Sequence, residues 1–278
     1  MSEHNQETRA TNGGPPDADT IISVRDVVVR YGEKTILSGV NLDIRRGETM
    51  VIMGGSGSGK STLLRRIIGL EKPTSGRIFV KGVDITSCTE KQLNEIRRIM
   101  GVSFQSAALF NSMTLADNVA LPLREHTKLA EPTIRLMTRM KLEQVGLGDA
   151  EKLYPAQLSG GMRKRASVAR AVAMDPEILM FDEPSAGLDP IIAAEIDSLI
   201  LDLKSAFKMT IVVVTHELAS AFLIADRMCM LRHGKILAVG TTDDIRNSDN
   251  PRIRQFLDRI PDKVTGDHEA YLKRLTQR

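Results

Sequence analysis

The chain has 278 residues and a 42% hydrophobic share, enough for the core of one large or two modest domains. Its 38 Lys and Arg against 35 Asp and Glu give a net charge of +3, which does not indicate a nucleic-acid-binding protein. No segment approaches the roughly 18 consecutive apolar residues that span a bilayer, and the polar N-terminus is not a secretory signal. We therefore expect any role at a membrane to depend on a partner protein.

The first element in chain order is a polar tail. Residues 1–20 contain Gly and Pro but no periodic apolar face, and we predict that they are disordered. From Ile21 to Tyr31 apolar and polar residues alternate as in a strand, and residues 40–44 predict a second strand. The continuous apolar run at residues 49–53 is typical of a strand covered on both faces, as in a parallel sheet.

Helical and strand-like segments alternate along the rest of the chain. We predict helices at residues 60–70, 90–98, 131–146, 162–173 and 190–206, and strands at residues 76–85, 178–181 and 211–214. This alternation predicts the α/β class, built on a sheet with buried parallel strands.

A glycine-rich loop joins the predicted strand at residues 49–53 to the helix that follows. It reads Gly54, Gly55, Ser56, Gly57, Ser58, Gly59, Lys60, Ser61 and Thr62. This fits the pattern G-x-x-x-x-G-K-[ST] in its required strand-loop-helix context, so we predict a P-loop that binds the phosphates of ATP. The glycines let backbone N–H groups point inward, and the helix start adds positive potential. Lys60 is expected to reach the β- and γ-phosphates, and Ser61 to bind Mg²⁺.

Two acidic residues follow the predicted strand at residues 178–181. At the end of a buried strand, Asp182 suits a Mg²⁺ ligand, and Glu183 is placed to polarise an attacking water. A strand that simply ends at the surface could also end in acids, but the P-loop favours the catalytic interpretation. A GTPase would carry an N-K-x-D motif, which this sequence lacks. A nucleotide kinase remains open at this point.

The motif Leu158-Ser159-Gly160-Gly161-Met162 closely resembles the signature motif of the ATPases of ABC transporters. A serine and glycines at a helix N-terminus form an anion site. The resemblance implies that Ser159, Gly160 and Gly161 contact the γ-phosphate of ATP held by a partner subunit. It therefore implies a homodimer with two ATP molecules between the chains.

Further positions match the family one at a time, and the resemblance covers about residues 21–245. Tyr31 resembles the aromatic that stacks on adenine, although on its strand alone it would more often be a core residue. Gln105 resembles the glutamine that senses Mg²⁺ and the attacking water. Asp189 ends a loop resembling one that crosses the dimer interface, and His216 resembles the histidine that contacts the γ-phosphate.

The resemblance also implies the architecture and the chemistry. The fold would be that of a P-loop NTPase (RecA-like), with a parallel-sheet core, an antiparallel β subdomain and a helical signature subdomain at about residues 106–172. The reaction would be ATP hydrolysis by water, with Glu183, His216, Gln105 and Lys60 as the catalytic group and Ser61, Gln105 and Asp182 around Mg²⁺. Residues 246–278 would form an extension beyond the ATPase domain.

The sequence departs from the family pattern next to the signature. Met162 replaces the glutamine commonly found there, and a thioether cannot make the same hydrogen bond across the dimer. The cluster Arg163, Lys164 and Arg165 follows at once, and we interpret it as a solvated helix face.

The segment after Gln105 narrows the resemblance. Residues 106–127, the LSGGM motif and residues 251–258 resemble the ATPases of the Mla (MCE-type) phospholipid transport systems. The resemblance implies transport of phospholipids between the inner and outer membranes, which maintains outer-membrane lipid asymmetry. It implies an MlaE-like permease, an MlaB-like STAS protein and an MlaD-like MCE protein as partners. The ATPase would lie peripherally on the cytoplasmic side of the inner membrane.

One alternative to phospholipid transport stays open. The ATPase of a small-solute, amino-acid-type ABC importer shares part of the segment after Gln105. A non-transport ABC protein is disfavoured, because this chain has one cassette and no room for a long coiled coil between the P-loop and the signature.

The sequence allows two interpretations of the C-terminus. It could be a solvated tail, or it could dock on a second protomer or a partner through Phe256 and Leu257, or through Tyr271 and Leu272.

Overall fold

The computed structural model describes residues 18–261. Its strands are β1 (Thr20–Tyr31), β2 (Lys34–Arg45), β3 (Thr49–Met53), β4 (Ser75–Val80), β5 (Val83–Asp84), β6 (Met100–Ser103), β7 (Ile178–Asp182), β8 (Thr210–Thr215), β9 (Arg227–Arg232) and β10 (Lys235–Thr241). Its α-helices are α1 (Lys60–Ile67), α2 (Glu90–Arg97), α3 (Leu115–His126), α4 (Glu131–Gln144), α5 (Gly160–Ala171), α6 (Pro190–Phe207), α7 (Leu218–Ile224), α8 (Thr242–Arg246) and α9 (Pro251–Leu257). The predicted α/β fold is confirmed. Residues 1–17 of the predicted tail lie outside the described residues, and β1 begins at Thr20.

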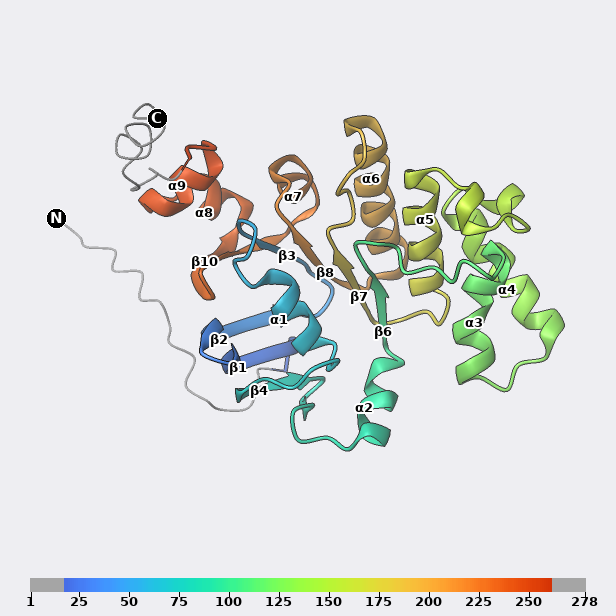
Figure 1. Ribbon diagram of the computed structural model, residues 1–278, viewed down its shortest axis with the longest axis horizontal. Coiled ribbons are helices and arrows are strands. Elements are labelled where there is room, and N and C mark those ends of the chain that lie inside the picture. The colour runs from blue at the N-terminus through green and yellow to red at the C-terminus, as the bar shows by residue number, and fades with distance from the viewer. Residues whose placement is uncertain (1–17, 262–278) are drawn as a thin grey trace, which may run out of the picture.

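The larger sheet is buried on both faces. Strands β6, β7, β8, β3 and β9 run parallel, and β10 pairs antiparallel with β9 at one edge. Because successive side chains on a strand point to opposite faces, Val51 and Met53 enter one hydrophobic cluster while Met50 and Ile52 enter the other. This explains the unbroken apolar runs in the sequence. Figure 1 shows α6 and α7 on one side of this sheet, and α1 with the antiparallel sheet on the other.

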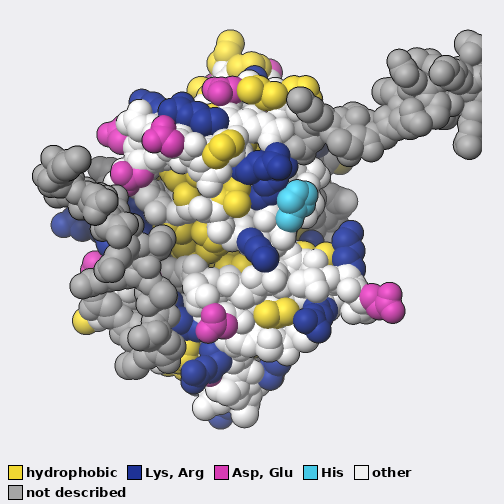
Figure 2. Space-filling view, turned by 90° about the vertical axis from the view of Figure 1, so that its left-hand side faces the viewer, with side chains coloured by type: hydrophobic (Ala, Val, Ile, Leu, Met, Phe, Trp, Pro, Cys, Tyr) yellow, Lys and Arg dark blue, Asp and Glu magenta, His cyan; other side chains and the backbone are white. Residues whose placement is uncertain are grey.

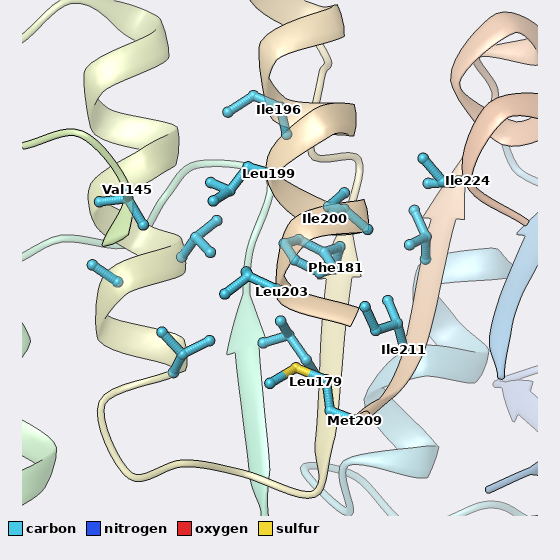
Figure 3. Packing of buried hydrophobic residues seen from close by; sticks show 14 of the residues in the cluster. Val145, Leu179, Phe181, Ile196, Leu199, Ile200, Leu203, Met209, Ile211 and Ile224 are labelled. Atoms are coloured by element: carbon cyan, nitrogen blue, oxygen red, sulfur yellow. The ribbon is translucent and has the colours of Figure 1, made fainter. Parts of the chain in front are cut away.

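The cluster beneath α6 is the core that fixes the position of β7. In Figure 3, Leu179 and Phe181 of β7 point toward side chains of α6. Phe181 is fully buried, as is Ile200 on the facing helix. Burying one such side chain contributes about 1.5–3 kcal/mol. The strand is therefore rigidly held immediately before the two acidic residues that follow it.

Parallel pairing brings distant residues to one edge of the sheet. Met53, the last residue of β3, pairs with Thr215 of β8. Asp182, the last residue of β7, pairs with Val214. The P-loop, the acidic pair and His216 therefore start from the same edge, where open α/β sheets bind their ligands.

The smaller sheet is antiparallel, in the order β2-β1-β4-β5. Its second strand begins at Lys34, well before the predicted start at residue 40, because the hairpin pairing continues from Tyr31 opposite Lys34 to Thr20 opposite Arg45. Gly39 has a positive φ of 67° at an irregular part of this pairing, and this residue breaks the strand pattern in the sequence.

Helices α3, α4 and α5 pack on one another on the right of Figure 1 and share a hydrophobic cluster with α6. The sequence did not predict α3, because Pro122 lies inside it and a proline usually marks a helix end. Thr114 caps the helix by accepting the N–H of Asp117 at 3.1 Å. The buried Asn118 accepts the N–H of Phe110 at 2.8 Å and donates to three backbone carbonyls. These bonds fix the loop that leads from β6 into α3.

The described part of the C-terminal extension, up to residue 261, folds back on its own chain. Ile253 of α9 is fully buried, and Phe256 and Leu257 pack against the same core cluster as α6. Because both side chains are only partly buried, docking of Phe256 and Leu257 on a second protomer or a partner stays a prediction, and Tyr271 and Leu272 lie outside the described residues. Figure 2 shows that hydrophobic side chains gather in the centre of the face at this end, with Lys and Arg around them. No helix among residues 18–261 is long and apolar enough to cross a bilayer.

Candidate active site

The P-loop follows β3 and opens α1 at Lys60, as the pattern predicted. Gly54 and Gly59 have positive φ values of 154° and 106°. A Cβ at Gly54 would lie 2.1 Å from the carbonyl oxygen of Leu231, and one at Gly59 would lie 2.6 Å from Leu37 Cδ2. Both positions therefore require glycine, for conformation and for space. The resulting curl is a cradle of backbone N–H groups of the kind that holds phosphate.

Lys60 lies buried inside this curl. Its Nζ donates to the carbonyl oxygens of Gly54 at 2.8 Å and Gly55 at 3.3 Å, and lies 3.7 Å from Glu183 Oε1. Burial lowers the pKa of the Lys60 ammonium below its ordinary value, and the carboxylates of Glu183 and Asp182 oppose the shift. The ammonium is thus surrounded by acceptors that a phosphate group could replace.

A hydroxyl and a carboxylate meet beside the loop. Ser61 Oγ donates to Asp182 Oδ1 at 2.8 Å. Among residues 18–261, no group of three or more His, Cys, Asp or Glu side chains forms a cage for a metal. A single carboxylate with a hydroxyl nevertheless fits Mg²⁺, which keeps several waters and takes phosphate oxygens as ligands. Gln105, the other residue expected near the metal, is exposed at the beginning of the segment after β6.

Glu183 is held on three sides. Its Oε2 lies 2.9 Å from Nδ1 of His216, and the backbone N–H of His216 donates to the same oxygen at 3.4 Å. Its own N–H donates to the carbonyl of Val214 at 2.8 Å. Its φ of 51° is unusual for a residue other than glycine. The carboxylate is therefore oriented by its neighbours rather than free in solvent.

Tyr31 lies at the end of β1 with 51% of its surface exposed, so the interpretation as a core residue is wrong. Its hydroxyl accepts a hydrogen bond from Arg66 Nη2 at 2.9 Å and donates to Glu71 Oε2 at 2.8 Å. The Arg66 guanidinium also lies 5.4 Å from the centre of the ring. Since Arg66 belongs to α1, the exposed ring is tied to the helix that carries the P-loop.

The signature motif caps the start of α5, as predicted. Ser159 Oγ accepts the N–H of Met162 at 3.2 Å, and the serine is exposed. A Cβ on Gly161 would lie 2.5 Å from Ile192 Cγ2, and one on Gly160 would lie 3.3 Å from Leu188. The signature therefore packs against the loop that leads into α6 and against the first turn of α6.

That cap is Asp189. Its Oδ1 accepts the N–H groups of Ile191 and Ile192, each at 3.1 Å. The structure thus gathers the predicted residues into two groups. Lys60, Ser61, Asp182, Glu183 and His216 meet at the sheet edge, whereas Ser159, Gly160, Gly161 and Asp189 lie around the starts of α5 and α6.

The basic cluster after the signature is the main correction to the sequence analysis. Arg163 is exposed, as a solvated helix face requires, but Lys164 is only 7% exposed. Its Nζ donates to the backbone carbonyls of Gln105 at 2.7 Å and Glu183 at 2.9 Å. Sequence reasoning missed this residue because a Lys between two Arg residues on a helix carries no signal of burial.

The curled loop, the buried lysine and the hydroxyl–carboxylate pair define a P-loop nucleotide-binding protein. The chain belongs to the ABC transporter family, whose sequence profile matches residues 37–186. The predicted resemblance is confirmed, and the chain is an ABC transporter ATPase.

Individual relatives agree with this assignment. The chain is 44% identical over 242 residues to MlaF of Escherichia coli K12, named as the ATP-binding protein of an intermembrane phospholipid transport system, covering 87% of this chain and 90% of MlaF. It is 46% identical over 236 residues to mkl of Mycobacterium leprae, a probable ribonucleotide transport ATP-binding protein, covering 85% of this chain and 68% of mkl. A dimeric ATP-binding cassette solved with ADP and Pi aligns with a TM-score of 0.73 and 32% identity, covering 80% of this chain and 98% of that one.

Proposed function

We propose that this chain hydrolyses ATP to drive the movement of phospholipids between the inner and outer membranes, and so maintains the lipid asymmetry of the outer membrane. The observation that carries the proposal is the 44% identity to MlaF along 90% of that protein. The intact P-loop, acidic pair and signature support an active ATPase in this role.

The residues of the sheet edge divide the hydrolytic work. Residues Gly54 to Thr62 cradle the phosphates, and Lys60 turns from the loop carbonyls to the β- and γ-phosphates. Tyr31 presents its ring to adenine. Ser61, Asp182 and Gln105 would hold Mg²⁺, and the ion would supply positive charge beside the phosphates.

The oriented carboxylate of Glu183 activates the attacking water. Glu183 accepts a proton from the attacking water, while His216 keeps the carboxylate in place and contacts the γ-phosphate. Because the groups are held before the substrate arrives, catalysis depends mainly on positioning and charge.

A second copy of the chain completes each site. Ser159, Gly160, Gly161 and Asp189 form a surface of helix starts suited to an anion. In the dimer, this surface of one protomer closes on the ATP bound by the other. The dimeric cassette with ADP and Pi supports this arrangement.

The remaining parts of the chain serve the assembly. The ATPase domain spans residues 21–245, with the helical subdomain at about residues 106–172 facing a permease resembling MlaE. A STAS protein resembling MlaB binds the ATPase, and an MCE protein resembling MlaD lies across the membrane. The ATPase lies peripherally on the cytoplasmic side of the inner membrane, and residues 246–278 form the C-terminal extension.

A mild-detergent pull-down of the tagged chain, followed by mass spectrometry, tests this function. Recovery of a permease, an MCE-domain protein and a STAS-domain protein with phospholipid is expected. The identity to mkl favours ribonucleotide transport as a second candidate. Recovery of a solute permease without an MCE protein, and ATPase activity stimulated by ribonucleotides other than ATP, would favour that candidate and overturn the lipid assignment.

A further inference from the structure

One face of α5 contacts the end of β6 and the segment that follows it through three side chains. Ser167 Oγ lies 3.0 Å from Ser103 Oγ. Arg170 donates to the carbonyls of Ala108 at 2.8 Å and Ala107 at 3.1 Å. Lys164 donates to the carbonyl of Gln105 at 2.7 Å. The side chains are spaced at three-residue intervals, so they form a row along the helix.

Lys164 alone in this row also contacts the hydrolytic residue. Its Nζ donates to the carbonyl of Glu183 at 2.9 Å, so one ammonium joins peptide groups that are far apart in the sequence. Both bonds are charge-assisted; the bond to Glu183 is buried, and the bond to Gln105 is partly buried. The same helix begins at Ser159 and the signature glycines.

The backbone that this row holds is conformationally unusual. Ala107 and Ala108 have φ values of 61° and 49°, and Glu183 has a φ of 51°. Residues other than glycine pay an energetic cost in this region and keep it only where the surroundings enforce it. Hydrogen bonds from Lys164 and Arg170 to the carbonyls of these residues hold the backbone in this conformation.

We propose that Lys164 is a positioning residue that ties the signature helix to Gln105 and Glu183, so that the placement of α5 sets the geometry for hydrolysis. This rests on the proposed roles of Gln105 and Glu183. A signature that engages ATP on a second protomer moves α5, and the ammonium carries this movement to the two peptide groups beside the first ATP. Lys164 does not touch ATP in this scheme.

An apolar side chain at this position would leave two carbonyls without their donor. Burial lowers the pKa of Lys164, whereas the Asp182 and Glu183 carboxylates oppose the shift. The ammonium therefore donates to two backbone carbonyls, and the charges of the two carboxylates favour its protonated form.

The test compares Lys164→Met and Lys164→Arg in the full-length chain, with Lys152→Met as the control, because Lys152 is an exposed lysine of the same subdomain. We expect Lys164→Met to lower kcat by about tenfold or more, while the Kd for ATP from calorimetry changes by less than about threefold. Lys164→Arg should recover much of kcat, and the control should match the unmodified protein. An unchanged kcat in folded Lys164→Met, or a loss of ATP affinity as large as the loss of kcat, would overturn the proposal.

Two further measurements keep the result decisive. If Lys164→Met does not fold, Lys164→Gln retains one neutral donor, and kcat should then fall in the order Lys, Arg, Gln; equal values would refute the role. Glu183→Gln is measured in parallel. If that variant turns over normally, the catalytic assignment of Glu183 fails. If Glu183→Gln is inactive while Lys164→Met has a normal kcat, only the role of Lys164 is rejected.

Discussion

The hydroxyl of Ser61, in the first turn of α1, donates a hydrogen bond to Oδ1 of Asp182, at the end of β7, and the two oxygens lie 2.8 Å apart. The two residues are 121 positions apart in the sequence and meet because β3 and β7 end at the same edge of one parallel sheet. This bond marks the place where we propose that Mg²⁺ binds.

Glu183→Gln should bind ATP and barely hydrolyse it. The amide keeps the size of the side chain but cannot accept a proton from water, and loss of a general base lowers a rate by about 100-fold or more. The ATP-bound dimer should then persist, which gel filtration with and without ATP would detect. Normal turnover in this variant would remove Glu183 as the base.

Lys60→Ala should abolish nucleotide binding or turnover. It removes the ammonium that lies among the loop carbonyls and the two carboxylates, and we expect a loss of about 100-fold or more in kcat/KM. Steady-state hydrolysis with a nucleotide-binding assay measures this. A rate of ATP hydrolysis near that of the unmodified protein would contradict the P-loop assignment.

Tyr31 offers a test that separates the ring from its hydroxyl. Tyr31→Ala should raise the Kd for ATP by about tenfold, because an aromatic stacking partner contributes about 1–3 kcal/mol. Tyr31→Phe keeps the ring but loses the bonds to Arg66 and Glu71, so its effect should be smaller. Equal and negligible effects of both changes would argue that adenine does not stack on this residue.

The buried Asp197 on α6 predicts a dependence of stability on pH. It is 4% exposed, its Oδ1 has no hydrogen-bond partner among the described residues, and burial raises its pKa, while a bond to Ser220 opposes the shift. A raised pKa in the folded state means that ionisation favours unfolding. The free energy of unfolding therefore falls as the pH rises from the pKa of Asp197 in the unfolded chain to its raised pKa in the folded protein.

Asp197→Asn removes this ionisation. The variant should gain about 1 kcal/mol in free energy of unfolding relative to the unmodified protein at pH 8, and gain little at pH 4. Urea denaturation at the two pH values measures the difference. A gain that does not change with pH would contradict the interpretation.

Two truncations separate packing from docking at the C-terminus. Removal of residues after 246 exposes the pocket of the fully buried Ile253, so we expect a loss of about 2–5 kcal/mol in stability. Removal of residues after 261 deletes Tyr271 and Leu272 but leaves α9 in place. If the shorter deletion leaves dimer assembly and partner capture unchanged, docking by those two residues is rejected.

The sequence by itself determined the fold class, the P-loop and the family. The reason is that each of these is written in local patterns: an apolar strand before glycines and Lys60, an apolar strand before Asp182, and a serine with glycines at the start of α5. The geometry of a phosphate cradle depends on neighbouring residues along the chain, so spacing alone reveals it.

Only the tertiary structure decided which charged side chains are buried and what they contact. Lys164 between two arginines has the pattern of a solvated helix face, and α3 contains a proline, so local rules misjudged both. The bond from Glu183 to His216, the clamp of Arg66 on Tyr31 and the bonds from Lys164 all join residues distant in the sequence. Such contacts depend on how the sheet and helices pack, because burial is a property of the assembled core and not of a sequence window.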